Sequence, residues 1–149
     1  MPSIHEVAKY MIENGSDVTP KKLQKLCYYA EAWHNALLGE SLINDTHFEA
    51  WVHGPVSPEL YRTYREYGWM NIDKVESDVE LTFNDKQTEL LESVIETYDE
   101  FSGNELEALT HNESPWVNQR IGLNEMEPSN NKISTDDMKT YYYSIYIGD

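Results

Sequence analysis

The residue types best suited to chemistry in this 149-residue chain are its five histidines, its single cysteine and its many carboxylates. His53 and His111 each come shortly before a proline turn, so folding could bring them together beside an acid, as in a metal site or a hydrolase. None of the histidines has a partner four residues away on a helix, and a histidine that donates a structural hydrogen bond is the simpler interpretation. We therefore expect no metal, no cofactor and no catalytic residue, and we expect that the protein is not an enzyme.

Cys27 falls among apolar residues of a predicted helix, which favours a packed thiol over a nucleophile. A single cysteine excludes an intramolecular disulfide and a cysteine-based zinc site, and it suits a reducing compartment. The sequence contains no phosphate-binding glycine loop and no Gly-x-Ser-x-Gly elbow. No stretch approaches the roughly 18 apolar residues that cross a bilayer, and the first residues do not resemble a signal peptide. We expect a cytoplasmic protein without membrane contact.

The formal net charge is −16, and most of it lies in the second part of the chain. Residues 68–149 carry eighteen acidic and five basic side chains, and residues 73–107 alone hold twelve acidic residues against two lysines. Such a chain repels phosphate backbones, so direct binding of nucleic acid is disfavoured. The acidic run predicts either a docking surface for a basic protein or simply a solvated surface, and the sequence leaves both open.

Helix-start signals are frequent, which indicates a mainly α-helical fold. A serine, threonine or asparagine stands before most apolar runs with helical spacing, and proline often follows it. The predicted helices begin near Ser3, Thr19, Ser57, Asn84, Ser114 and Ser134, with a further short helix that contains Leu106 and Leu109. We predict a mainly α fold: a compact single-domain helical bundle over residues 1–149, with about six or seven helices and a small two- to three-stranded β element.

The predicted β element draws on two alternating segments. Residues 48–52 alternate and are rich in aromatic side chains, and Gly54-Pro55 breaks this strand. Residues 79–83 also alternate, so we expect them to pair with it as a second strand. A two-stranded ribbon is only marginally stable alone and must pack on helices. Residues 69–78 are expected to form a loop.

Basic and aromatic side chains gather on the helix that starts at Thr19. We place the only basic cluster, Lys21, Lys22 and Lys25, on the polar side of this helix. A tyrosine offers a large contact area at low entropic cost and one polar tip, as binding hot spots require, but it can equally fill a core. We expect a mixture, with at least two buried, among Tyr28, Tyr29, Tyr61, Tyr64 and Tyr67.

Three motifs, taken in order along the chain, resemble those of the Panacea domain, the family of SocA-like antitoxins and phage-associated proteins. They are KLQKLCYYA at residues 22–30, FEAWVHGPV at residues 48–56, and LTH followed by SPW within residues 109–116. Each motif alone is modest, whereas the ordered set covers essentially the whole chain and is fairly specific. The resemblance implies a compact helical domain with a small β element.

The resemblance also implies an antitoxin that neutralises a toxin encoded beside it by direct binding, in a family common in prophages. It implies a polar partner-binding surface near the turn in the second motif, formed by Lys25, Tyr28, His53, Tyr61 and His111. A structural role is expected for the residues that set turns, start a helix or bury a ring: Trp51, Gly54, Pro55, Pro115 and Trp116.

Other partners fit the same motifs. One branch of the family is a proteolytic adaptor, which delivers its toxin to a cellular protease; the acidic run or the C-terminal tyrosines could supply the second surface. A phage protein that binds a host factor without any toxin would also carry these motifs. The partner is therefore a cognate toxin in the leading interpretation and a protease or host factor in the others, and the sequence does not predict the oligomeric state.

Overall fold

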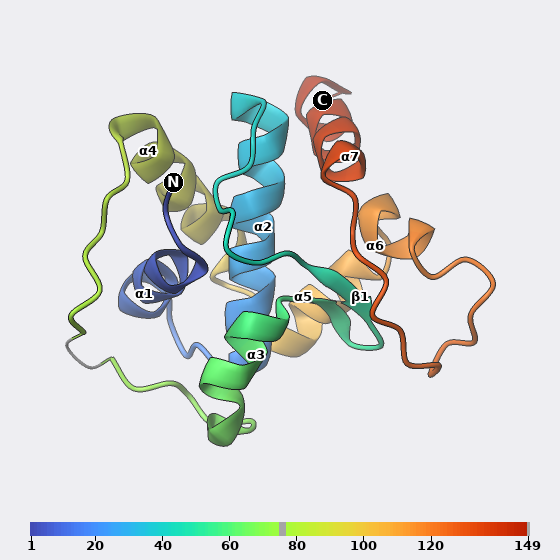
Figure 1. The fold of residues 1–149 in the computed structure, drawn as a ribbon, viewed down its shortest axis with the longest axis horizontal. Coiled ribbons are helices and arrows are strands. Elements are labelled where there is room, and N and C mark those ends of the chain that lie inside the picture. The colour runs from blue at the N-terminus through green and yellow to red at the C-terminus, as the bar shows by residue number, and fades with distance from the viewer. Residues whose placement is uncertain (75–76, 149) are drawn as a thin grey trace.

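One long helix, α2 (Pro20–Leu38), runs through the centre of the protein (Figure 1). The computed structural model describes residues 1–74 and 77–148. The Thr19 hydroxyl caps α2 by accepting a hydrogen bond from a backbone N–H of the first turn at 3.2 Å. Gly39 ends the helix in the left-handed region, with a φ of +78°. The signals read from the sequence therefore define both ends of the central helix.

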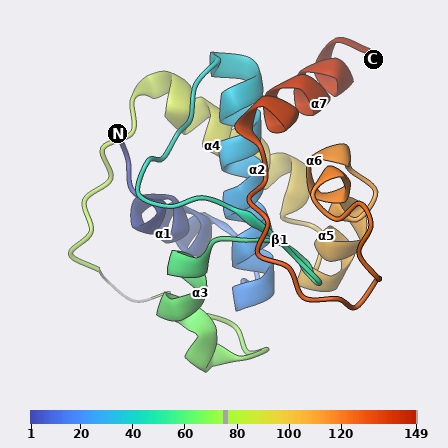
Figure 2. The ribbon, with the colours of Figure 1, turned by 45° about the vertical axis from the view of Figure 1, so that its right-hand side comes forward.

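The other elements surround α2. They are α1 (Ile4–Asn14), β1 (Glu49–Trp51), β2 (Gly54–Val56), α3 (Pro58–Tyr64), the 3₁₀ helix η1 (Arg65–Tyr67), α4 (Asp85–Tyr98), α5 (Gly103–Thr110), α6 (Ser114–Asn118) and α7 (Thr135–Gly148). Helices α1 and α4 pack on one side of α2 and α7 on the other, while α3, α5 and the hairpin enclose its first turns (Figures 1 and 2). The predicted mainly helical fold with a small β element is confirmed. Within the described residues, no helix is long and apolar enough to span a membrane.

The helix starts follow the sequence signals with one exception. At α1 the Ser3 hydroxyl accepts from the Glu6 N–H at 3.2 Å, and the Glu6 carboxylate accepts from the Ser3 N–H at 2.8 Å. The same reciprocal capping box recurs at the start of α4 and α5. Ser114 is the exception, because it lies inside α6 and Glu113 takes the N-cap position without a side-chain cap. The Glu113 side chain points into the core instead.

The second strand of the sheet is not the one that alternation predicted. β1 pairs antiparallel with β2 across a two-residue turn, with Trp51 opposite Gly54. The Gly-Pro pair expected to break the strand forms part of β2, since Gly54 adopts a φ of +109° after the tight reversal. Residues 79–83 form no strand. The Thr82 N–H and hydroxyl donate instead to Glu6 Oε1 at 2.8 and 2.7 Å, which ties this segment to α1.

The C-terminal segment before α7 lies along the other edge of β1. Ala50 donates its N–H to the Asn131 carbonyl, and Ile133 donates its N–H to the Phe48 carbonyl, both at 2.8 Å. The predicted loop at 69–78 contains no helix or strand in its described part; its residues 75 and 76 lie outside the described residues. The hairpin is therefore held between α2 and a segment that comes about 80 residues later in the chain.

A buried cluster of tyrosines joins α2 to α7 around one carboxylate. The Tyr29 and Tyr142 hydroxyls both donate to Glu113 Oε1 at 2.8 Å, and the Tyr28 hydroxyl lies 3.1 Å from that of Tyr142. All four side chains are buried. Burial raises the pKa of Glu113 to about 7, against the lowering effect of the two tyrosine hydrogen bonds. The prediction that at least two of the tyrosines are buried is confirmed by Tyr28 and Tyr29.

Candidate functional site

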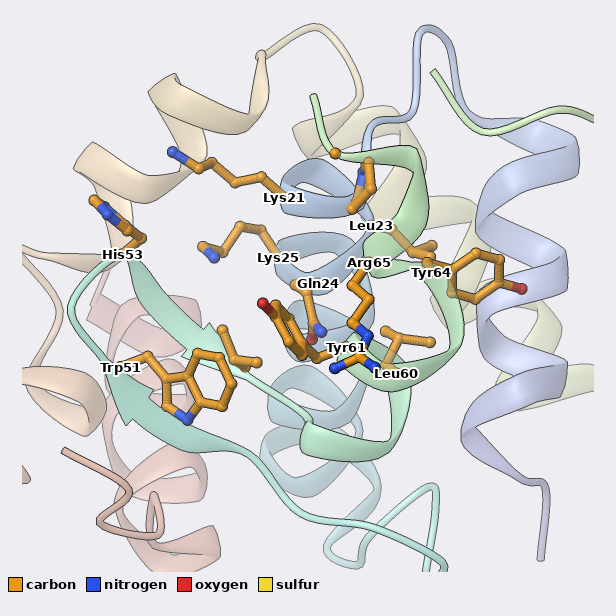
Figure 3. Close-up of a pocket in the computed structure, with 13 residues that line it drawn as sticks. Lys21, Leu23, Gln24, Lys25, Trp51, His53, Leu60, Tyr61, Tyr64 and Arg65 are labelled. Atoms are coloured by element: carbon orange, nitrogen blue, oxygen red, sulfur yellow. The ribbon is translucent and has the colours of Figure 1, made fainter. Parts of the chain in front are cut away.

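A cavity of about 280 Å³ opens between α2, the β1–β2 hairpin and α3 (Figure 3), and we call it the hairpin pocket. It brings together three of the residues assigned to partner binding from the sequence: Lys25 of α2, His53 of the hairpin turn and Tyr61 of α3. Trp51 packs beside Tyr61 in its wall, with ring centroids 5.1 Å apart. Segments far apart in the sequence thus build one hollow with a mixed aromatic and basic lining.

Gln24 fixes the position of α3 beside this pocket. Its amide nitrogen donates to the Ser57 carbonyl at 3.1 Å, and its amide oxygen accepts from the Ser57 N–H at 2.8 Å. The Ser57 hydroxyl then caps α3 by accepting from the Leu60 N–H at 3.3 Å. Both polar residues are buried, so one amide satisfies both backbone groups of Ser57 and determines where α3 begins. The position of Tyr61 on α3 follows from this pairing.

The hairpin passes very close to α2 at Gly54. A Cβ atom on this residue would lie 2.6 Å from Lys25 Cε, closer than real Cβ contacts come, and 3.0 Å from Thr110 Oγ1, at the short limit of such contacts. The φ of +109° is also one that side chains rarely adopt. Glycine is therefore required here for the backbone conformation and for the close approach to Lys25.

Two lysines of α2 are buried, which contradicts the prediction that they lie on a polar side of the helix. The Lys22 amino group has three acceptors: the Ser16 carbonyl at 2.6 Å, the Asp99 carbonyl at 2.7 Å and Asp99 Oδ1 at 3.0 Å. The Lys25 amino group, although only 1% exposed, has a single acceptor among the described residues, the Pro55 carbonyl at 3.4 Å. Lys22 is thus a fully paired structural lysine, whereas Lys25 is not.

Glu107 of α5 pairs with Lys21 and His53, two of the side chains that line the pocket. It accepts from Lys21 Nζ at 2.7 Å and lies 3.1 Å from His53 Nδ1. Burial alone would raise the pKa of Glu107, but the hydrogen bonds from Lys21 and His53 outweigh it and lower the pKa. Burial lowers the pKa of Lys25 to about 7, although the nearby Glu107 carboxylate acts in the opposite direction. The Lys25 amino group therefore changes charge near neutral pH.

His111 supports the hairpin from behind and does not line the pocket. Its ring stacks on Trp116 with centroids 4.0 Å apart, and the Trp116 indole N–H donates to the Trp51 carbonyl at 2.8 Å. The Arg120 guanidinium lies over the Trp116 ring, 5.2 Å from its centroid, and donates to the Ala50 carbonyl at 2.9 Å. Burial lowers the pKa of His111. The third sequence motif thus holds β1 in place.

His53 and His111 lie within electrostatic range of each other and of Glu107. Each ring is engaged differently, because His53 is bonded to Glu107 with 61% of its side chain exposed and His111 is stacked on Trp116. In residues 1–74 and 77–148 no group of three or more His, Cys, Asp or Glu side chains could hold a metal ion.

Tyr28, a predicted partner-binding residue, neither reaches the surface nor lines the hairpin pocket. Its ring is fully buried against Phe48, with centroids 5.6 Å apart, and against Tyr142 of α7. It cannot contact a partner while the core is intact. Among the residues assigned a structural role, Gly54, Pro55 and Pro115 are buried, and Trp51 and Trp116 are half-buried.

Sequence reasoning missed one residue that lines the pocket, Arg65, and one exposed residue next to the lining in the chain, Trp69. Arg65 lines it from η1 and is exposed, and Trp69 follows Gly68, which also lines it. Trp69 is 87% exposed, an unusual state for so large an apolar side chain. The only signal in the sequence was an aromatic residue in a loop, without apolar neighbours at helical or strand spacing.

Comparison with known proteins gives one match. A family model described as antitoxin SocA-like, Panacea domain, matches residues 23–117, which include α2 from its second turn, the hairpin, α3 and all of α4 and α5. No curated protein and no solved structure matches the chain. The matched range contains Lys25, His53 and Tyr61, the three predicted residues that meet in the hairpin pocket.

Proposed function

Since the chain belongs to the family of SocA-like antitoxins with a Panacea domain, we propose that it neutralises a co-encoded toxin by binding it directly through the face around the hairpin pocket. The observation that carries this proposal is the meeting of Lys25, His53 and Tyr61, from three separate elements, in one hollow. Family membership supports an antitoxin-type role. That the partner is a toxin, and that the gene comes from a prophage, are parts of our proposal.

The surroundings of the pocket have the composition of a protein-binding surface. Tyr61 is 43% exposed, and Trp69 and Met70 are 87% and 59% exposed at the tip that follows η1. Tryptophan, tyrosine and arginine are the residue types most enriched among binding hot spots. Arg65 comes between Tyr61 and Trp69 in the sequence. An exposed apolar tip that follows pocket-lining residues in the chain therefore favours a protein partner.

Replacing Trp69 with alanine is expected to weaken the complex with the toxin by about thirtyfold or more, the effect of losing a hot-spot tryptophan. The unfolding free energy should stay within about 0.5 kcal/mol of the wild-type value, because the side chain is 87% exposed. The measurement is the dissociation constant of the complex with the product of the adjacent gene, together with rescue of growth when both are expressed.

The matched control is Ile147→Ala, in the last turn of α7, which is 62% exposed and does not line the hairpin pocket. It should leave both affinity and rescue unchanged. If the wild-type chain formed no complex with the adjacent product and gave no rescue, the proposal would fail. If Trp69→Ala bound as well as the wild type, the toxin would have to dock elsewhere.

We further propose that neutralisation is stoichiometric and needs no catalytic step. The polar groups around the pocket act as binding groups in this scheme. Glu107 is held by Lys21 and His53, and the Gln24 amide is used to position α3. The acidic residues of α4, among them Glu89, Glu92 and Glu96, are exposed and serve solubility or attraction of a basic partner.

A proteolytic adaptor is the second candidate, because the protein has another apolar surface away from the hairpin pocket. A cavity of about 550 Å³ lies between α2, α4 and α7, lined in part by Leu37, Leu38 and Tyr146. Tyr146 is 61% exposed. In an adaptor, Tyr146→Ala should lengthen the half-life of the toxin several-fold in growing cells without weakening the complex. If the half-life of the toxin did not change in this variant, or were the same in strains that lack each cellular protease, the adaptor role would be excluded and direct neutralisation would remain.

A further inference from the structure

Four basic side chains line the hairpin pocket, although the protein as a whole carries a net charge of −16. They are Lys21, Lys25, His53 and Arg65, and among the described residues no aspartate or glutamate joins them in the lining, although Glu107 pairs with Lys21 and His53 beside it. Figure 3 shows Lys21 and Lys25 reaching from α2 toward the hairpin, with His53 beyond them and Arg65 on the side of α3. A local concentration of basic side chains on an otherwise acidic protein is the setting in which a negatively charged ligand group would bind.

Lys25 is the group in this pocket that most clearly requires a further partner. A buried ammonium is stable when its three N–H donors are matched, as those of Lys22 are by three acceptors at 2.6, 2.7 and 3.0 Å. Lys25 has only the Pro55 carbonyl at 3.4 Å among the described residues, longer than the roughly 2.7–2.9 Å of a good charge-assisted hydrogen bond. An entering anion would supply the missing acceptors.

The remaining lining restricts what kind of anion can enter. Leu23, Val56 and Leu60 form apolar walls, and the Trp51 and Tyr61 rings flank the opening. The volume of about 280 Å³ is just below the roughly 300–1,000 Å³ of sites that enclose drug-sized molecules. A short hydrocarbon stem with a terminal carboxylate fits both the apolar walls and the basic interior.

We infer that the hairpin pocket receives the carboxylate of a glutamate or aspartate side chain that the partner protein inserts against Lys25. The inference deepens the proposed function and rests on it only for the source of the carboxylate. Lys21 and His53 are already paired with Glu107, which offsets their charge, whereas Lys25 supplies unmatched donors. Gly54 leaves the space in which the Lys25 side chain lies.

The test uses the free protein and two small probes, N-acetyl-glutamate methylamide and its glutamine counterpart, followed by NMR titration of the backbone and indole N–H signals. The glutamate probe should shift signals of the hairpin, α2 and α3 in a saturable way, and the glutamine probe should bind at least about tenfold more weakly. Lys25→Met keeps the length of the side chain and should abolish the preference for the glutamate probe. Lys139→Met, which removes an exposed lysine from α7, should keep it.

Equal binding of the two probes, no saturable shift, or a preference that survives in Lys25→Met would overturn the inference and leave toxin binding intact. Unchanged signals outside the pocket establish that the Lys25→Met variant is folded. In the complex with the adjacent gene product, Lys25→Met should weaken binding about tenfold or more, and equal affinity would likewise overturn the inference. A chain that binds the glutamate probe but not that product would support the chemistry of the pocket and remove the toxin as the source of the carboxylate.

Discussion

Glu113→Gln is expected to stabilise the protein at pH 8 by on the order of 3 kcal/mol and to change its stability little at pH 4.5. Burial raises the pKa of Glu113 from 4.5 to about 7, so the folded protein binds a proton more tightly than the unfolded chain. That contribution to stability is fully present below pH 4.5 and is lost as the pH rises from 4.5 to 7. A glutamine cannot lose the proton, while its amide oxygen can still accept from Tyr29 and Tyr142.

The measurement is the melting temperature of both proteins across pH 4.5–8, where 3 kcal/mol corresponds to about 6–12 °C in a domain of this size. Glu6, Asp99 and Glu107, whose pKa values are lowered, destabilise both proteins on acidification and cancel in the difference. Glu96→Gln removes an exposed carboxylate and should show no pH-dependent difference. A difference for Glu113→Gln that stays constant with pH would mean that the buried carboxyl does not titrate in this range.

The helices could be predicted from the sequence because their ends are decided locally. A capping serine, threonine or asparagine satisfies backbone N–H groups within three residues, so the signal and its effect lie in the same short stretch. Ser3, Thr19, Ser57 and Asn84 all cap as their spacing predicted. Ser114 did not, because the neighbouring Glu113 is drawn into the core by Tyr29 and Tyr142, which come from elements far away in the sequence.

The burial of α2 could not be predicted in the same way. Spacing of apolar residues places lysines on a polar face only when a helix has one side toward solvent. α2 is surrounded by α1, α3, α4, α5, α7 and the hairpin, so Lys22 and Lys25 are enclosed and Tyr28 is removed from the surface. The partner of β1 was missed for a related reason: alternation at residues 79–83 is equally consistent with packing along α1, and the tight turn makes β2 the nearer partner.

The same enclosure gives Gly54 a large expected effect. Gly54→Ala should lower the free energy of unfolding by about 2–4 kcal/mol, through the φ of +109° and the approach of the new Cβ to 2.6 Å from Lys25 Cε. The Lys25 side chain is 1% exposed and lies between the hairpin and α2, so it can give way only toward the hairpin pocket and with loss of its contact to the Pro55 carbonyl. Urea denaturation of the variant measures the loss.

A double-mutant cycle with Lys25→Ala separates these two causes. Lys25→Ala removes Cε, so Gly54→Ala should cost about 1–2 kcal/mol less in that background, and the remainder reports the backbone strain. Gly39→Ala is the matched control, since Gly39 also has a positive φ, +78°, but a Cβ there would meet nothing within 4 Å. Its cost should be about 1 kcal/mol and should not depend on Lys25. If the cost of Gly54→Ala were the same with and without Lys25, the close contact between Gly54 and Lys25 would not contribute to stability. The role of Gly54 would then be limited to its backbone conformation.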